Sequence, residues 1–159
     1  MSNIKIVSVG QTAENGLFTI CYESKDVSEF EDFVMRFKND ATCAEDLQTI
    51  LVALQRMLQM GGFLERHFRP EGKMKDRVCA VPITTNKLRL YCLRLSDRVL
   101  IVGNGGRKST KTYEEDEELN GYVIDLQKLD ALLRGEIRKG TVKIEGGTIE
   151  GIENKEFGL

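Results

Sequence analysis

The sequence has few of the residues on which metal-binding, disulfide-bonded and membrane-spanning proteins depend. It contains four cysteines, one histidine, two prolines and no tryptophan. The cysteines (Cys21, Cys43, Cys79 and Cys92) form no C-x-x-C pair, so we expect neither a zinc ribbon nor a disulfide framework. No run approaches the roughly 18 apolar residues of a membrane span, and the first ten residues lack the apolar stretch of a signal peptide. These absences predict a reduced, cytoplasmic protein with no metal, no cofactor and no membrane partner.

The length and composition are typical of one globular domain. The chain has 159 residues, of which 41% are hydrophobic and 30% are charged. A domain of this size buries roughly 68–70% of the surface that its unfolded chain exposes, which suffices for a core without disulfides or metals. No proline- or serine-rich linker divides the chain. We therefore expect a single domain over residues 1–159.

The charged residues are distributed unevenly along the chain. Segment 66–111 contains twelve Lys and Arg and three acids, a net charge of +9, whereas the other 113 residues carry a net charge of −11. A basic middle between acidic flanks favours a cationic face that meets phosphate or an acidic partner. The alternative is a solvated sheet edge on which lysines and arginines prevent aggregation.

Hydrophobic periodicity predicts an α+β fold with one antiparallel sheet of about four to five strands. Strands are expected over residues 4–9, 17–22, 77–81, 87–95 and 98–102. Helices are expected over about 30–37, 44–60 and 116–138, and a small hairpin over about 140–152. Asn15-Gly16 is a hairpin-turn signal. The run Gly103–Gly106 is expected to end the last central strand.

Three motifs are weaker than they first look. Residues 103–110 (GNGGRKST) follow a strand and precede a helix, but Arg107 stands directly before Lys108, where a phosphate-binding loop needs Gly. His67 has no second imidazole with which to share a metal, so a structural role is expected. Cys79 and Cys92 lie in apolar strands, where we expect them in the core.

Basic residues near the centre of the chain form the most informative pattern. In the strand around Arg89, alternation places Lys87, Arg89 and Tyr91 on one face. Two antiparallel strands joined by a tight turn bring Arg89 and Arg107 to the same end of the sheet. Arginine donates in a planar fork that matches phosphate oxygens, and Tyr113 supplies a ring on which a base can stack. The pattern indicates an RNA-phosphate site.

These segments resemble a known family. The Arg-Leu-Tyr strand at 89–91, the Val-Leu-Ile-Val strand at 99–102 and the Arg-Lys-x-x-Lys-Thr run that starts at Arg107 resemble the RelE/ParE/HigB superfamily of toxins from type II toxin–antitoxin systems. The preceding strand and two helices fit as well, so the resemblance covers about residues 17–137. It implies a small α+β fold in which two or three helices pack on an antiparallel sheet.

For the mRNA-cleaving members, the resemblance also implies residue roles. Arg89 matches the arginine at the scissile phosphate, Arg107 the arginine at the leaving 5′ oxygen, and Tyr113 the tyrosine that orients the nucleotide. Lys75 is the candidate general base, because neighbouring cations depress a lysine pKa. The further phosphate-binding candidates are Lys73, Arg77, Lys87, Lys108 and Lys111. The adjacent 2′-hydroxyl serves as nucleophile, so the reaction requires no metal.

The sequence therefore predicts a ribosome-dependent mRNA endoribonuclease, the toxin of a toxin–antitoxin pair. Its expected partners are the ribosome, mRNA and a cognate antitoxin, for which a helix-turn-helix protein is one option. The alternative is a non-catalytic toxin or binding module of the same fold, either similar to the gyrase inhibitors or able only to bind its antitoxin.

Overall fold

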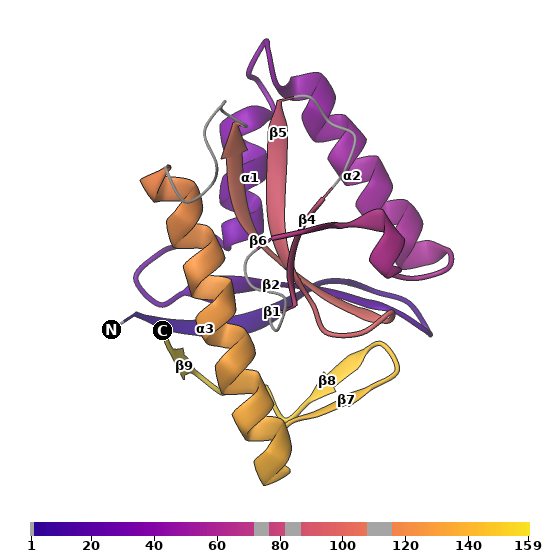
Figure 1. Cartoon of the computed structure of the whole chain (residues 1–159), viewed down its shortest axis with the longest axis vertical. Helices are drawn as coiled ribbons and strands as arrows, with labels where there is room; N and C mark the ends of the chain where they lie inside the picture. The colour runs from indigo at the N-terminus through magenta and orange to yellow at the C-terminus, as the bar shows by residue number, and fades with distance from the viewer. Residues whose placement is uncertain (1, 72–76, 82–86, 108–115) are drawn as a thin grey trace.

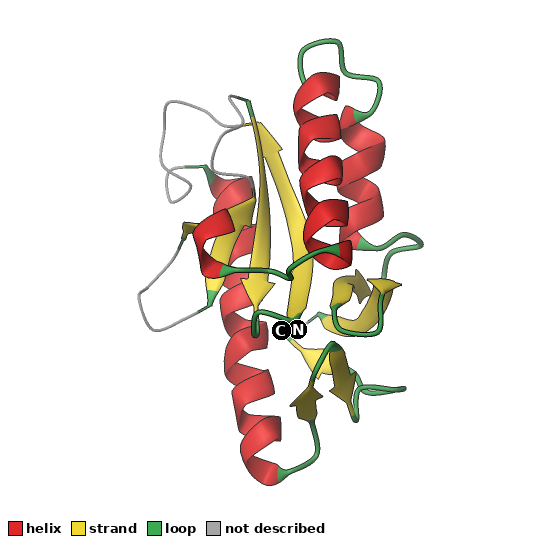
Figure 2. Cartoon of the chain, turned by 90° about the vertical axis from the view of Figure 1, so that its right-hand side faces the viewer, coloured by secondary structure: helices red, strands yellow, loops and turns green. Residues whose placement is uncertain are grey.

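A seven-stranded sheet lies between helices on both of its faces. The computed structural model describes residues 2–71, 77–81, 87–107 and 116–159. Figure 1 shows the long helix α3 in front of the sheet, and Figure 2 shows the sheet between α3 and the pair α1 and α2. The helices are α1 (Glu29–Phe37), α2 (Ala44–Gln59), the short 3₁₀ helix η1 (Glu65–His67) and α3 (Glu117–Lys139). The expected α+β class is confirmed.

The sheet has the strand order β3-β4-β5-β6-β2-β1-β9. Its strands are β1 (Asn3–Gln11), β2 (Gly16–Tyr22), β3 (Arg69–Pro70), β4 (Val78–Val81), β5 (Leu88–Arg94), β6 (Val99–Arg107) and β9 (Phe157–Gly158). The expectation of about four to five strands is wrong, because β3 and β9 are two-residue strands too short to show alternation. One pair, β2 with β6, is parallel and the others are antiparallel.

The helices form where apolar stripes predict them. The helix α1 begins after Ser28, whose side chain accepts a hydrogen bond from the Glu31 backbone N–H. Residues of α2 bury a stripe against one sheet face, and residues of α3 bury a stripe against the other. These residues are Leu47, Ile50, Leu54 and Met57 in α2, and Leu119, Val123, Leu126, Leu129 and Leu133 in α3. A hydrophobic core therefore lies on each face of the sheet.

The glycine run does not end the central strand, which corrects the sequence-based expectation. The strand β6 continues through Gly103–Gly106 to Arg107 and stays paired with β5. A Cβ on Gly106 would lie 2.9 Å from Leu119 of α3, and one on Gly105 would lie 1.9 Å from the Arg89 carbonyl oxygen. The glycines are thus needed for close packing inside the sheet and not for a turn.

A β-bulge interrupts the pairing of β5 with β6. Cys92 pairs with Val102 and Leu90 pairs with Gly105, so β6 has one residue more than β5 between the two pairs. A one-residue slip moves every following side chain to the other face of a sheet. The bulge therefore decides which face Arg107 takes.

The C-terminal segment forms a small hairpin and adds the edge strand β9 beside β1. The expected hairpin is confirmed as β7 (Lys143–Glu145) and β8 (Thr148–Glu150). Its turn packs on the β1–β2 turn, since a Cβ on Gly147 would lie 2.5 Å from the Asn15 carbonyl carbon. The chain then returns to β1 as β9, so both ends of the chain lie side by side in Figure 1.

We predict that Gly105→Ala lowers the free energy of unfolding by about 1–3 kcal/mol, because the added methyl group overlaps the Arg89 carbonyl. Gly135→Ala is the matched control. Gly135 lies inside α3 with open space around its Cβ position, so alanine there should stabilise the helix by roughly 0.5–1 kcal/mol. Urea denaturation of both variants measures the difference, and equal stability of the two would contradict the tight packing.

Candidate nucleic-acid interface

The structure describes four of the nine residues that the sequence analysis assigned to an RNA site. These are Arg77, Lys87, Arg89 and Arg107. The other five, Lys73, Lys75, Lys108, Lys111 and Tyr113, lie outside the described residues.

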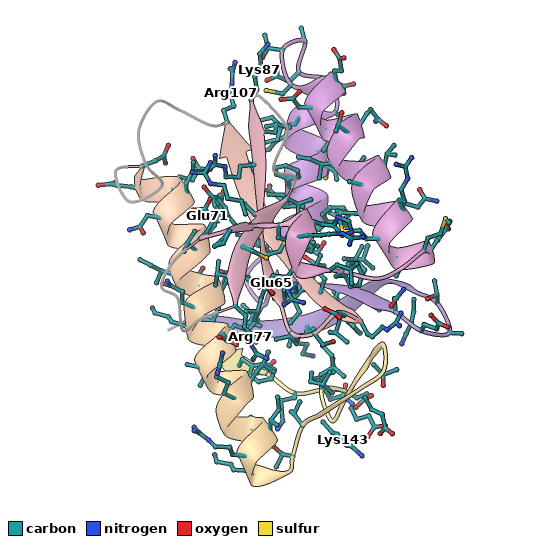
Figure 3. The ribbon with its side chains drawn as sticks, turned by 45° about the vertical axis from the view of Figure 1, so that its right-hand side comes forward. Glu65, Glu71, Arg77, Lys87, Arg107 and Lys143 are labelled. Atoms are coloured by element: carbon teal, nitrogen blue, oxygen red, sulfur yellow. The ribbon has the colours of Figure 1, made fainter. Side chains whose placement is uncertain are left out.

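Lys87 and Arg107 lie at one end of the sheet. Arg107 is the last residue of β6 and pairs with Leu88, the first residue of β5, directly after Lys87. Figure 3 shows both side chains together at the top of the molecule, well away from Arg77. Both residues are exposed, and neither forms an ion pair with another described residue.

Arg89 lies near the same end of the sheet but on the opposite face from Arg107. Register pairs Arg89 with Gly106, which faces α3, whereas Arg107 donates from Nη2 to the Thr42 hydroxyl, 3.0 Å away in the α1–α2 connection. Without the bulge, Arg89 and Arg107 would share a face. Arg89 and Arg107 thus lie at the same end of the sheet, as expected. Because their side chains are on opposite faces, they do not contact a single phosphate together.

Arg89 is bound to a buried carboxylate. Its Nη1 lies 3.1 Å from Glu71 Oε1, and the Glu71 side chain is only 6% exposed. Burial raises the pKa of the Glu71 carboxyl, while the charges of Arg89 and Arg69 act in the opposite direction. Burial and the nearby Glu71 charge raise the pKa of Tyr91 to about 12, so this hydroxyl stays protonated at neutral pH. Arg89 therefore compensates a buried charge.

Arg77 is also held inside the protein. Its Nε donates to Asp130 Oδ1 of α3 at 2.8 Å, and it donates to the Leu95 carbonyl at 3.4 Å. Asp130 is nearly fully buried, and its other oxygen accepts from Arg134. This ion pair fastens α3 to the end of the sheet opposite Lys87.

Ion pairs neutralise five of the eight lysines and arginines that the structure describes in segment 66–111. Acids within and outside the segment pair with its arginines: Arg69 with Glu71, Arg94 with Asp97 and Glu65, and Arg98 with Glu14. The acidic flanks have thus folded onto the basic middle. Among the described site candidates, Lys87 and Arg107 retain charges that no acid pairs.

Acidic residues of the α1–α2 region lie beside this sheet end and reduce its positive potential. Asp46 Oδ2 accepts the backbone N–H of Lys87 at 2.7 Å and that of Leu88 at 3.2 Å, which fixes the start of β5. Hydrogen bonds from Thr42 lower the pKa of the Asp40 carboxyl, and the Arg107 charge lowers it further. An anion bound at Lys87 and Arg107 would therefore have a modest affinity that falls strongly as the salt concentration rises.

A partly buried polar network behind Arg107 was missed by the sequence analysis. Arg36 of α1 donates to the side chain of Asn104 and, at 2.7 Å, to the Gly105 carbonyl, while Asn104 donates to Asp32 at 2.8 Å and to Glu29 at 3.4 Å. The i, i+4 spacing of Asp32 and Arg36 was its only local signal. The network fixes the last residues of β6.

Two tyrosines border this network. Tyr122 of α3 donates to Glu118 at 2.8 Å, and Tyr22 of β2 donates to Asp125. Burial and these carboxylates raise the pKa of both phenols above the ordinary range. Both hydroxyls therefore act as donors at neutral pH: that of Tyr22 joins β2 to α3, and that of Tyr122 bonds within α3.

Other chemical groups offer little reactivity. The four cysteines are free thiols, and Cys79 and Cys92 lie buried in the core as expected. Burial raises the pKa of Cys92 well above its ordinary value, so this thiol is a poor nucleophile. Across the described ranges, no three His, Cys, Asp or Glu gather as metal ligands, and no helix has the length and apolarity to cross a bilayer.

Comparison of the chain with protein-family models, with curated proteins and with solved structures finds no match.

We predict that Arg89 is required for stability, since its removal leaves the buried Glu71 charge with only the more distant and more exposed Arg69 as a partner. Arg89→Ala should lower the free energy of unfolding by roughly 3 kcal/mol, and Arg89→Met combined with Glu71→Gln should recover most of the loss. Arg107→Ala, at an exposed position, should change it by less than about 0.5 kcal/mol. Thermal and urea unfolding test this, and equal effects of the two alanine variants would refute it.

Proposed function

We propose that the protein binds the phosphate backbone of single-stranded RNA at the sheet end marked by Lys87 and Arg107. The observation that supports this is the contrast between these two side chains and the other described basic candidates. Arg77 and Arg89 are engaged by buried acids, whereas Lys87 and Arg107 are exposed and unpaired by acids. Their charges are available to a ligand from outside.

The chemistry of the two side chains suits phosphate. Arg107 presents a guanidinium fork that matches two phosphate oxygens, and Lys87 adds a flexible ammonium nearby. The Arg107 guanidinium is oriented by Thr42, and the end of β6 is fixed by the Arg36–Asn104 network. A donor held in place loses less conformational entropy when it binds.

This proposal requires no catalytic role for Arg89. A phosphate at Arg107 lies on one face of the sheet, and Arg89 is committed to Glu71 on the other. The proposal therefore keeps the RNA-phosphate site of the first sequence-based hypothesis without its cleavage, and it differs from the alternative, whose binding module was gyrase-inhibitor-like or bound only an antitoxin. The proposed RNA affinity comes from the charges of Lys87 and Arg107 and from contacts to phosphate. Such contacts do not distinguish one base sequence from another.

A second candidate is the toxin-type, ribosome-dependent mRNA endoribonuclease with a RelE-like fold. It is favoured by the order of elements between residues 16 and 139: one strand, two helices, the short η1, four strands of which β3 has two residues, and a helix. This order agrees with what the resemblance implies. In this case the ribosome would have to supply groups that complete a site around Arg107.

We predict that single-stranded RNA binding depends on Lys87 and Arg107. Fluorescence anisotropy with labelled oligouridylate at several salt concentrations should give a slope of log K against log salt that falls by about 0.7 in Lys87→Ala and in Arg107→Ala. Lys143→Ala is the matched control, because Lys143 lies at the opposite end of the molecule in Figure 3. No binding at low salt, or an equal loss in Lys143→Ala, would refute the proposed interface.

Cleavage separates the two candidates. In a reconstituted translation system, the binding module should leave mRNA intact, with or without ribosomes. Ribosome-dependent cleavage that disappears in Arg107→Ala would instead establish the endoribonuclease. Lys143→Ala again controls for a general loss of charge.

A further inference from the structure

The connection between α1 and α2 holds the Arg107 guanidinium through two side chains. Arg107 Nη2 donates to the Thr42 hydroxyl at 3.0 Å, and this hydroxyl lies 2.8 Å from Asp40 Oδ1. A hydroxyl group has one proton to donate, a guanidinium cannot accept a hydrogen bond, and an ionised carboxylate cannot donate one. The Thr42 proton therefore points at Asp40, and a lone pair of the same oxygen points at Arg107. Asp40 thus fixes the direction from which Thr42 accepts.

Asp40 is itself held in place by the backbone before α2. Its Oδ1 also accepts the backbone N–H groups of Thr42 at 2.8 Å and of Cys43 at 3.1 Å. The hydrogen bond from the Thr42 hydroxyl, followed by that from the Thr42 backbone, lowers the pKa of the Asp40 carboxyl, so this group is charged at neutral pH. The contact with Thr42 uses only one of the five N–H groups of the Arg107 guanidinium.

The Asp40 charge also acts on an anion that binds Arg107. The Arg107 charge lowers the pKa of Asp40, so the two charges attract each other, and Asp40 in turn opposes a negative charge placed beside Arg107. A second acid, Asp46, lies at the same sheet end, because its Oδ2 accepts the backbone N–H groups of Lys87 and Leu88.

The number of negative charges on a phosphate group therefore matters at this sheet end. Asp40 and Asp46 accompany Lys87 and Arg107 in equal number, so a second negative charge on the ligand is attracted and repelled to a similar extent. An internal phosphate of RNA carries one negative charge, whereas a terminal phosphate monoester carries about −1.5 to −2 at pH 7. Direct hydrogen bonds from an oriented guanidinium serve both kinds of phosphate. The monoester gains no advantage from its additional charge.

We propose that Asp40 directs the RNA site toward internal phosphodiester groups, because it positions Arg107 through Thr42 and opposes the additional charge of a phosphate monoester. The ligand is then the interior of an RNA strand, and a 5′-phosphorylated end or a free nucleotide gains nothing from its terminal phosphate. Asp40 is a positioning residue, since it reaches the guanidinium through the Thr42 hydroxyl. This selectivity rests on the proposed RNA binding at Lys87 and Arg107.

Two oligonucleotides that differ only at the 5′ end test the selectivity. Pentauridylate, labelled at its 3′ end and carrying either a 5′-hydroxyl or a 5′-phosphate, should bind the wild-type chain with equal affinity in fluorescence anisotropy. Asp40→Asn keeps an acceptor oxygen for Thr42 and removes the charge, so the 5′-phosphate should then improve binding about two- to fivefold. Glu145→Gln is the matched control, because Glu145 lies in the same strand as Lys143, at the opposite end of the molecule in Figure 3. This variant should bind the two oligonucleotides equally.

The positioning of Arg107 is measured without RNA. In the free ¹⁵N-labelled chain, relaxation of the Arg107 Nε–H signal should show a more mobile guanidinium in Asp40→Ala and in Thr42→Val, and wild-type behaviour in Asp40→Asn and Thr42→Ser. Thr42→Val should also weaken binding of the 5′-hydroxyl oligonucleotide about threefold, and Thr42→Ser should restore it. Thr49→Val is the matched control, because the exposed Thr49 hydroxyl donates within α2 to the Glu45 carbonyl.

The results distinguish an absence of selectivity from an absence of RNA binding itself. A wild-type chain that binds RNA through Arg107 but prefers the 5′-phosphate would overturn the role of Asp40 and leave the RNA site standing. So would equal binding of the two oligonucleotides by Asp40→Asn, or an Arg107 guanidinium that stays rigid in Thr42→Val. If the wild-type chain binds neither oligonucleotide, the RNA site and its selectivity are both wrong.

Discussion

The attachment of β6 to α1 is the constraint on which the rest of the structure depends. The parallel pairing of β2 with β6 ends at Thr19 and Val102, and beyond it β6 has only β5 as a strand neighbour. The Thr19 hydroxyl donates to the Val102 carbonyl at 2.7 Å, and Arg36 with Asn104 provides the next hydrogen bonds. Side chains of α1 thus replace the missing strand, and they hold Arg107 at the exposed end.

Pairing of charges explains why so basic a segment yields so small a cationic surface. A buried acid without a partner costs several kcal/mol, so Asp130 and Glu71 require Arg77 and Arg89. These arginines join α3 and β3 to the central sheet. Lys87 and Arg107, the two site candidates that no acid pairs, are not used in this way by the packing.

The sequence predicts the helices well, because their apolar stripes recur over several turns at α1, α2 and α3. It also predicts that Arg89 and Arg107 meet at one sheet end, because that follows from the β5–β6 connection. It does not predict that they take opposite faces, since one extra residue in β6, where Gly103 and Asn104 stand opposite Tyr91, reverses the alternation. Nor does it predict the Glu71 and Asp130 ion pairs or β9, which join segments distant along the chain.

The most direct test of this account is to locate RNA on the protein. Titration of the ¹⁵N-labelled protein with short oligouridylate would follow backbone amides and arginine Nε–H signals together. The account predicts shifts at Lys87, Arg107 and Thr42, with the Arg77 and Arg89 side-chain signals unchanged. Shifts centred on Arg77 and Arg89 would contradict it, because those guanidinium groups would then have to leave Asp130 and Glu71 to meet the phosphate.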